Sequence, residues 1–234
     1  MEEKLRGIVL GGVNYGENDK ILTIFTLEKG TISARIKGVK KAGAKLKFAS
    51  EPFCFAEFIF LTSPTKRTVV NASLIDSFYP IREDISKFYC AGAMVEFVRR
   101  FAKEEIISPK TFLLLADSLK KIAYDDFKPK LTLICFLVKA LKISGYALNV
   151  SGCAVCGKKI DSRPFFDYDT GSFFCEDCNS FGREIKISTL NALLEVLEGK
   201  DVEEELSTQV LKLLDFYIIN KTEEKLNSLK ELIK

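Results

Sequence analysis

The sequence of 234 residues predicts an α+β multidomain chain, with a small β barrel followed by a helical bundle that a four-cysteine insert interrupts. Three observations predict this fold class. The first eighty residues hold short apolar runs separated by turn signals, a pattern typical of strands. After Pro80, apolar residues recur at helical spacing. Two CxxC pairs then follow in a stretch without helical periodicity.

Five segments of residues 1–80 are predicted strands, at 5–13, 20–27, 31–39, 51–61 and 67–77. The third alternates cleanly and indicates a half-buried strand with a basic outer face. Its expected inward residues are Ile32, Ala34 and Ile36, and its expected outward residues are Ser33, Arg35 and Lys37. The fourth is apolar on both faces, so we expect the barrel interior to cover one face and a neighbouring domain the other. Five strands suit an OB-type barrel (an OB-fold), although periodicity does not separate it from an SH3-like barrel.

Helices are predicted next, from about residue 84 to 103, from 109 to 124 and from 129 to about 144. Ser108 is the expected N-cap of the second, with Pro109 at its first position. The third is apolar nearly all round and is the expected centre of a bundle. Helices resume at 188, at 203–219 and at 222–234. The predicted domains are a nucleic-acid-binding barrel of residues 1–80, a bundle of 81–148 and 183–234, and an insert of 149–182.

The insert carries the most specific pattern in the chain: Cys153 and Cys156 form one CxxC pair, and Cys175 and Cys178 form the second. Two such knuckles supply four sulfurs in the arrangement that tetrahedral zinc prefers. A predicted hairpin between the pairs gives the shape of a zinc ribbon, so the sequence predicts one structural zinc ion in a four-cysteine, zinc-ribbon-like insert. The alternatives are two disulfides or a redox-active CxxC. A redox-active CxxC usually lies at the start of a helix in a thioredoxin-like βαβ unit, and the sequence around neither pair predicts such a unit.

A basic segment between Lys29 and Lys47 contains no acidic residue. Its members are Lys29, Arg35, Lys37, Lys40, Lys41, Lys45 and Lys47. Lys66 and Arg67 lie at a later turn that a small barrel would bring near. Such a cluster creates a local positive field and can hold phosphates without reading sequence. The alternative interpretation is a solvated surface with no ligand.

Enzymatic chemistry is disfavoured, because the chain has no histidine to act as a base at neutral pH. Glu17 and Asp19 lie in a short loop, where acidic residues usually cap turns. No phosphate-cradling loop is present. The start lacks a secretory signal and no apolar run is long enough to span a bilayer, so a cytoplasmic protein without a membrane partner is expected.

The N-terminal stretch GIVLGGVNYGENDKILTIFTLEKGTISARIKGVKK resembles the RecO family of bacterial recombination mediators and DNA repair proteins. The matching steps are Gly16-Glu17-x-Asp19, Thr26-x-Glu28-Lys29-Gly30 and Lys37-Gly38. Segments 89–96 and 111–119 fit as well, so the resemblance covers essentially the whole chain. The four cysteines make the chain similar to the zinc-bearing kind of this family.

The resemblance implies an N-terminal OB-fold, a helical domain and a zinc module in a protein that is not an enzyme. It implies binding of single- and double-stranded DNA, annealing of complementary strands, and loading of RecA with RecR on strands coated by single-strand binding protein (SSB). Such a protein would associate with the nucleoid when bound to DNA. The family's DNA contacts carry over to Arg35, Lys37, Lys40, Lys41 and Lys45. The remaining alternatives are an accessory factor that binds RNA and a zinc-dependent enzyme.

Overall fold

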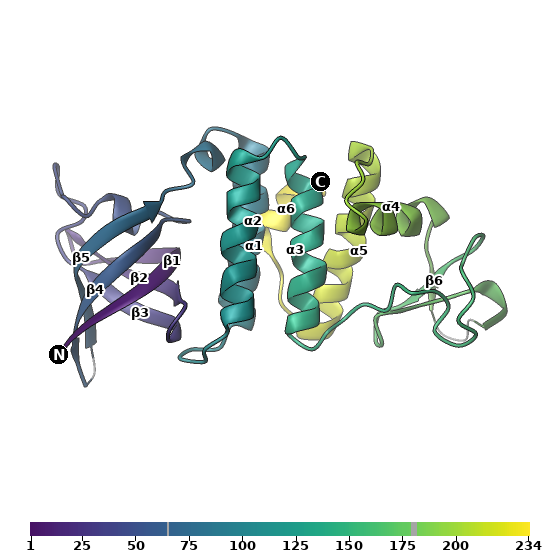
Figure 1. The fold of residues 1–234 in the computed structure, drawn as a ribbon, viewed down its shortest axis with the longest axis horizontal. Helices are drawn as coiled ribbons and strands as arrows, with labels where there is room; N and C mark the ends of the chain where they lie inside the picture. The colour runs from purple at the N-terminus through teal and green to yellow at the C-terminus, as the bar shows by residue number, and fades with distance from the viewer. Residues whose placement is uncertain (65, 179–181) are drawn as a thin grey trace. The chain divides into compact units, whose positions relative to one another are not determined.

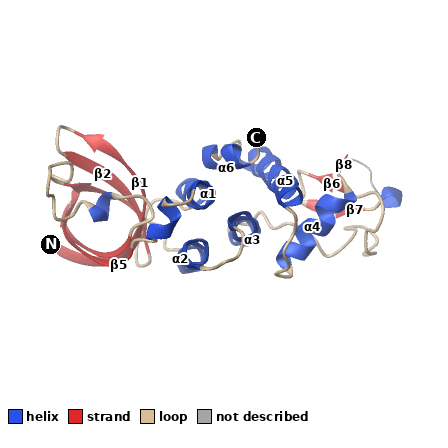
Figure 2. Cartoon of the chain, turned by 90° about the horizontal axis from the view of Figure 1, so that it is seen from above, coloured by secondary structure: helices blue, strands red, loops and turns tan. Residues whose placement is uncertain are grey.

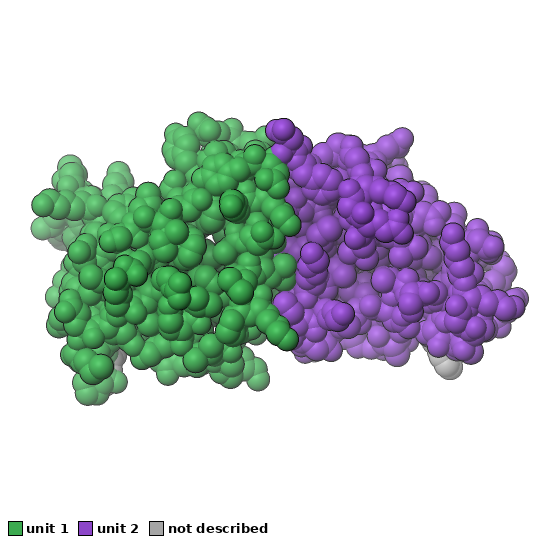
Figure 3. Space-filling model, viewed as in Figure 1, with its two compact units in different colours: residues 1–91, 95–125 green, residues 92–94, 126–234 purple. Residues whose placement is uncertain are grey.

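A computed structural model describes residues 1–64, 66–178 and 182–234. The chain divides into two compact units, shown in different colours in Figure 3. Unit 1 comprises Met1–Ala91 and Val95–Asp125, and unit 2 comprises Gly92–Met94 and Asp126–Lys234. The domain boundaries predicted near residues 80, 148 and 182 follow changes in secondary structure and not these units, so they stay predictions.

Unit 1 contains a closed five-stranded barrel (Figures 1 and 2). Its strands are β1 (Glu2–Tyr15), β2 (Asp19–Thr26), β3 (Gly30–Ile36), β4 (Phe55–Ser63) and β5 (Lys66–Asp76). They are arranged in the order β1-β2-β3-β5-β4, and β4 pairs back with β1. The β3–β5 pair is parallel and the other pairs are antiparallel. Closure leaves no free sheet edge, and the strand count confirms the predicted OB-like barrel.

The barrel interior is filled by the alternating residues that the sequence predicts. On β3, Ile32 and Ile36 are fully buried, whereas Ser33, and Lys37 directly after the strand, are exposed. Burial of these apolar side chains stabilises the barrel by roughly 25 cal/mol per Å² removed from water. An irregularity in the β1–β2 register between Val9 and Gly11 shifts which residues of β1 face inward.

Two short 3₁₀ helices, η1 (Phe48–Ser50) and η2 (Tyr79–Arg82), and two helices, α1 (Ile85–Phe101) and α2 (Pro109–Tyr124), complete the elements that begin in unit 1. The Phe112 ring of α2 lies 5.7 Å from Phe25 of β2 and 5.8 Å from Phe55 of β4, measured between ring centroids. This helix therefore covers one part of the outer barrel face. It explains why β4 is apolar on both faces.

The start of α2 differs in detail from the prediction. Ser108 precedes Pro109 as expected, but its side chain makes no hydrogen bond to the helix backbone. Its hydroxyl instead pairs with the hydroxyl of Thr111 at 2.8 Å. Proline lacks an N–H group, so it leaves one fewer unpaired donor at the start of the helix.

Unit 2 contains α3 (Pro129–Ile143), α4 (Ile187–Leu197), α5 (Glu204–Thr222) and α6 (Asn227–Leu232). Most of α3 is buried, as expected for a central helix. The predicted helix from residue 222 is wrong in its start. The Thr222 hydroxyl donates to the carbonyl of Ile218 at 2.7 Å, so Thr222 belongs to the last turn of α5, and Glu223 then takes a left-handed conformation. Among the described residues, no helix is both long and apolar enough to cross a membrane.

The four-cysteine insert of unit 2 folds around a small sheet of β6 (Phe165–Asp167), β7 (Ser172–Phe174) and β8 (Arg183–Glu184), in the order β7-β6-β8. The hairpin turn depends on Gly171, which has a φ of +69°. An added Cβ there would lie 2.5 Å from the Tyr217 hydroxyl on α5. The buried ring of Phe166 also contacts Tyr217, at 5.7 Å between centroids. The insert is therefore anchored on α5. Part of it, residues 179–181, lies outside the described residues.

Candidate metal centre and nucleic-acid interface

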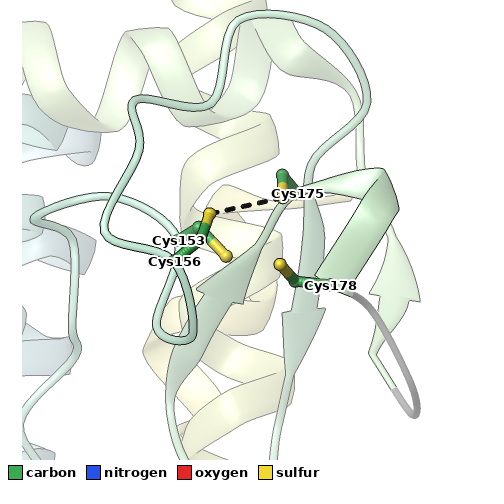
Figure 4. A group of neighbouring side chains, drawn as sticks. All are labelled: Cys153, Cys156, Cys175 and Cys178. Carbon is green, nitrogen blue, oxygen red and sulfur yellow. Dashed lines mark hydrogen bonds between the residues drawn. The ribbon is translucent and has the colours of Figure 1, made fainter.

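The four cysteines of the insert form one cluster (Figure 4). All four Sγ atoms lie within 4.8 Å of one another. Cys153 is buried, Cys175 and Cys178 are half-buried, and Cys156 is exposed. The spacing in the sequence predicted this convergence, and the hairpin of β6 and β7 brings the two pairs together across the intervening residues.

Backbone hydrogen bonds shape each CxxC pair into a tight turn. The Cys153 N–H donates to the carbonyl of Lys158, and the Gly157 N–H donates back to the carbonyl of Cys153, both at 2.9 Å. Gly157 has a φ of +70°, a conformation that glycine takes at little cost. The second pair spans a short 3₁₀ helix, η3 (Glu176–Cys178), in which the Cys178 N–H donates to the carbonyl of Cys175.

The geometry fits a tetrahedral metal ion. Zinc–sulfur bonds of about 2.3 Å place the sulfurs of a regular tetrahedron about 3.8 Å apart. The Cys156 and Cys175 sulfurs are 3.8 Å apart. That separation is nearly twice the length of a disulfide bond, and none of the four cluster cysteines forms a disulfide within the described residues. The four cysteines therefore have the chemistry and spacing to hold one soft divalent cation.

Backbone N–H donors and neighbouring sulfurs shift the pKa values of Cys153 and Cys178 in opposite directions. Burial raises the pKa of the Cys153 thiol, but N–H donors from Cys156, Cys175 and Val155 outweigh it and bring the pKa to about 6. The pKa of Cys178 rises to about 12, first because of its contact with Cys175 and then because of Cys156. Four neighbouring thiolates are stable together only when a cation balances their charge.

A second candidate site is the basic surface of unit 1, defined as the exposed lysines on β5 and in the segment between β3 and β4. Its members are Lys37, Lys40, Lys41, Lys45, Lys47 and Lys66. In the part of the chain that the structure describes, none of these ammonium groups lies in an ion pair. Their charges are therefore available to an anionic ligand.

Asp19 fixes the start of the basic segment against the β1–β2 turn. Its carboxylate accepts from the Gly38 N–H at 2.7 Å and from Arg35 Nε at 2.8 Å. The Lys40 N–H donates to the carbonyl of Asn18 at 3.0 Å. These contacts are consistent with the interpretation of Asp19 as a capping group. The Asp19 carboxylate binds the Gly38 N–H and the Arg35 side chain.

The two arginines of the predicted DNA set have partners within the protein. Arg35 pairs with Asp19, and Arg67 pairs with Glu105 at 2.7 Å. Lys29 likewise pairs with Glu3. The β3–β5 register sets Arg35 opposite Thr68, which puts Lys66 level with Ser33 on the same outward face. Lys66 is thus about 13 Å along the strands from Lys37, not beside it. The basic surface is therefore carried by lysines.

The pH dependence of stability should reveal the Asp19 contacts. The Gly38 N–H and then the Arg35 side chain lower the pKa of Asp19 below its ordinary value of 3.8, against a smaller opposing effect of burial. Because the folded pKa is depressed, the stabilisation is present above that ordinary value and is lost as pH falls through the folded pKa. Asp19→Asn should therefore melt below wild type at pH 7, and the gap should close in acid.

Thermal melts between pH 7 and pH 3 measure this effect. Glu17→Gln is the matched control, because Glu17 is an exposed acid of the same turn, and it should follow the wild-type profile. A gap between Asp19→Asn and wild type that stays constant down to pH 3 would show that the carboxylate charge does not contribute.

The Thr26-x-Glu28-Lys29-Gly30 step of the sequence forms the turn between β2 and β3. The Thr26 hydroxyl donates to the carbonyl of Gly30 at 2.8 Å and accepts from the Lys29 N–H at 3.1 Å. Gly30 has a φ of +70°, and a Cβ there would lie 2.2 Å from the carbonyl oxygen of Ile106. Position 30 therefore requires glycine, and Thr26 and Gly30 serve the turn between β2 and β3.

Sequence reasoning missed Tyr15, the last residue of β1. Tyr15 is 48% exposed, and the Arg35 guanidinium lies over its ring at 4.9 Å from the centroid. The signal in the sequence was the alternation of Val13 and Tyr15 on β1. That alternation indicates an outward face only once the irregularity at Gly11 is known.

Two family models match the chain, one after the other. The family model described as "Recombination protein O N terminal" matches residues 1–78, and "Recombination protein O C terminal" matches residues 82–230. The chain is 32% identical over 175 residues to the DNA repair protein RecO of Acetivibrio thermocellus, covering 75% of this chain and 70% of that protein.

Two further relatives show how far the likeness extends. The DNA repair protein RecO of Desulforamulus reducens is 29% identical over 236 residues, covering 96% of this chain and 91% of that protein. The DNA repair protein RecO of Myxococcus xanthus is 29% identical over 227 residues, covering 94% of this chain and 93% of that protein. With both family models matched in chain order over nearly the whole length, the chain belongs to the recombination protein O (RecO) family.

Proposed function

We propose that this protein is a non-enzymatic DNA-binding mediator of recombination and repair. The observation that carries the proposal is the basic surface, whose six exposed lysines have no ion-pair partner in the part of the chain that the structure describes. Family membership supports DNA as the anion, since the relatives are named DNA repair proteins. Lysine contacts to phosphates position a strand without selecting a sequence, as a general mediator requires.

The proposed DNA contacts are the basic surface lysines, Lys37, Lys40, Lys41, Lys45, Lys47 and Lys66. Arg35 and Arg67 belong to the predicted set, but their charges are offset by Asp19 and Glu105 and contribute less to phosphate binding. The lysines that follow β3 are held near the β1–β2 turn by the Asp19 and Asn18 contacts. A strand bound there would follow the segment after β3 and the β1–β2 turn.

In this proposal one zinc ion occupies the cysteine cluster and has a structural role. Four thiolates fill a tetrahedral shell and leave no position for a reacting water. The ion would fix the insert on α5, where Phe166 and Tyr217 already pack. The proposed partners are single- and double-stranded DNA, RecR and SSB, with RecA acting on the product. The proposed place of action is the cytoplasm, at the nucleoid when DNA is bound.

Strand annealing tests this function directly. We expect the protein to speed the pairing of two complementary oligonucleotides, bare or coated with SSB, because it neutralises phosphates on both strands and raises their local concentration. The acceleration should fall steeply as salt rises. Failure to bind DNA at low salt, or a clear preference for RNA of the same sequence, would contradict the proposal.

A further inference from the structure

The outer face of the barrel carries an exposed aromatic ring beside the basic surface. Tyr15 is paired with Asp19 at the turn end of the β1–β2 hairpin. The neighbouring outward row runs from Val13 through Ile21 to Arg35 across three strands, as the registers of β1, β2 and β3 set it. Val13 is 60% exposed and Tyr15 is 48% exposed. Val13 and Tyr15 therefore stand in solvent on this face, beside the half-buried Ile21 and Arg35.

Arg35 and Asp19 hold the Tyr15 ring in position. The Arg35 guanidinium lies 4.9 Å from the ring centroid, within the range of a cation–π contact. Asp19 holds that guanidinium through Nε at 2.8 Å and through a second nitrogen at 2.5 Å. A ring supported in this way loses little additional freedom when a flat ligand stacks on it, which lowers the entropic cost of binding.

The ring also adjoins the phosphate-binding lysines. Asp19 is the cross-strand neighbour of Tyr15 and accepts from the Gly38 N–H, and Lys40 bonds the turn at Asn18. Lys37 lies one outward position beyond Arg35, directly after β3. An aromatic ring next to a lysine-lined path is the combination by which proteins hold single strands, with the base on the ring and the backbone on the cations.

We propose that Tyr15 is a base-stacking residue for single-stranded DNA. The inference rests on the proposed DNA binding and assigns it a specific side chain and strand form. In a duplex the bases stack on one another, and exposing one requires unstacking energy, so the Tyr15 ring favours single strands. The lysines bind either form through phosphate, and Tyr15 supplies the preference between them.

The absence of tryptophan from the chain makes the stacking directly observable. Tyr15→Trp introduces the only tryptophan, and its fluorescence should be quenched saturably by oligo(dT). Tyr79→Trp is the matched control, because Tyr79 is a similarly exposed tyrosine of the same unit, at 59%. Its fluorescence should change little. An oligonucleotide of abasic sites supplies phosphates without bases and should not quench Tyr15→Trp.

Affinity gives the second readout. Stacking of one base is worth about 1–3 kcal/mol, so Tyr15→Ala should weaken oligo(dT) binding roughly tenfold. The slope of affinity against salt should be unchanged, because no phosphate contact is lost. Tyr15→Phe keeps the ring and should bind as wild type, and Tyr79→Ala should also bind as wild type. Duplex affinity should be insensitive to Tyr15→Ala.

The outcomes separate this inference from the proposed function. If Tyr15→Ala binds oligo(dT) as wild type while neutralised lysines weaken it, the barrel binds DNA but the stacking role is wrong. If Tyr15→Ala weakens single strand and duplex equally, or if abasic DNA quenches Tyr15→Trp as strongly as oligo(dT), stacking is also wrong. If wild type binds no DNA, both proposals fail.

Discussion

Replacing Cys156 with serine is expected to lower the zinc affinity of the protein at least about 100-fold, because loss of even an outer-shell partner of a metal site typically costs 10–100-fold. Cys156 is the exposed member of the cluster, so the substitution disturbs no packing. Structural zinc contributes its binding free energy to folding, and the insert should therefore lose its fixed structure together with the metal.

Two measurements check this expectation: the zinc content by mass spectrometry, and the melting temperature with and without a chelator. Val155→Ser is the matched control, since Val155 is the preceding residue and is also exposed. It should keep one zinc per chain and the wild-type melting temperature. A Cys156→Ser protein with one tightly held zinc and an unchanged melt would show that the cluster is not a four-ligand site.

Neutralising Lys37, Lys40 and Lys41 together by Lys→Gln substitution should weaken single-strand binding about 100-fold at about 0.1 M salt. Each phosphate contact on a single strand adds about 0.7 to the slope of log affinity against log salt, so three lost contacts flatten it by about 2. The fold should survive, because all three side chains are exposed and lie outside the ion pairs of the described residues.

The control is a second triple Lys→Gln variant with the same change in charge, at Lys103, Lys110 and Lys120. These lysines are exposed in unit 1 but belong to α2 and the loop before it. Fluorescence anisotropy of a labelled oligonucleotide at several salt concentrations measures both variants. Equal losses of affinity in the two triple variants would mean that only the net charge of the protein matters. Unchanged binding by the variant at Lys37, Lys40 and Lys41 would show that the basic surface does not bind DNA.

Much of the site was predictable because its signals are local. The two CxxC pairs are each four residues long, and the hairpin that joins them is marked by Asp169 to Gly171. The strand alternation of Ile32 to Lys37 was equally readable. Local patterns of this kind depend on backbone geometry within one element, and the sequence displays them directly.

The remaining features depend on pairing between distant segments. The partners of Arg35 and Arg67 lie 16 and 38 residues away, so the sequence alone gave no reason to discount either arginine as a DNA contact. The exposure of Tyr15 depends on the irregularity near Gly11 in the pairing of β1 with β2. The extension of α5 past residue 219 follows from a Thr222 contact that propensity does not encode.

Hydrogen–deuterium exchange of the whole protein with saturating oligo(dT) tests most directly whether the barrel face is the working surface. The account predicts slower exchange in residues 15–19 and 37–47, because a bound strand would cover the β1–β2 turn and the lysine segment that Asp19 joins to it. Exchange around Cys153 to Cys178 should be unchanged. Slowing confined to the cysteine insert or the helices of unit 2, with none in residues 15–19 or 37–47, would contradict the account.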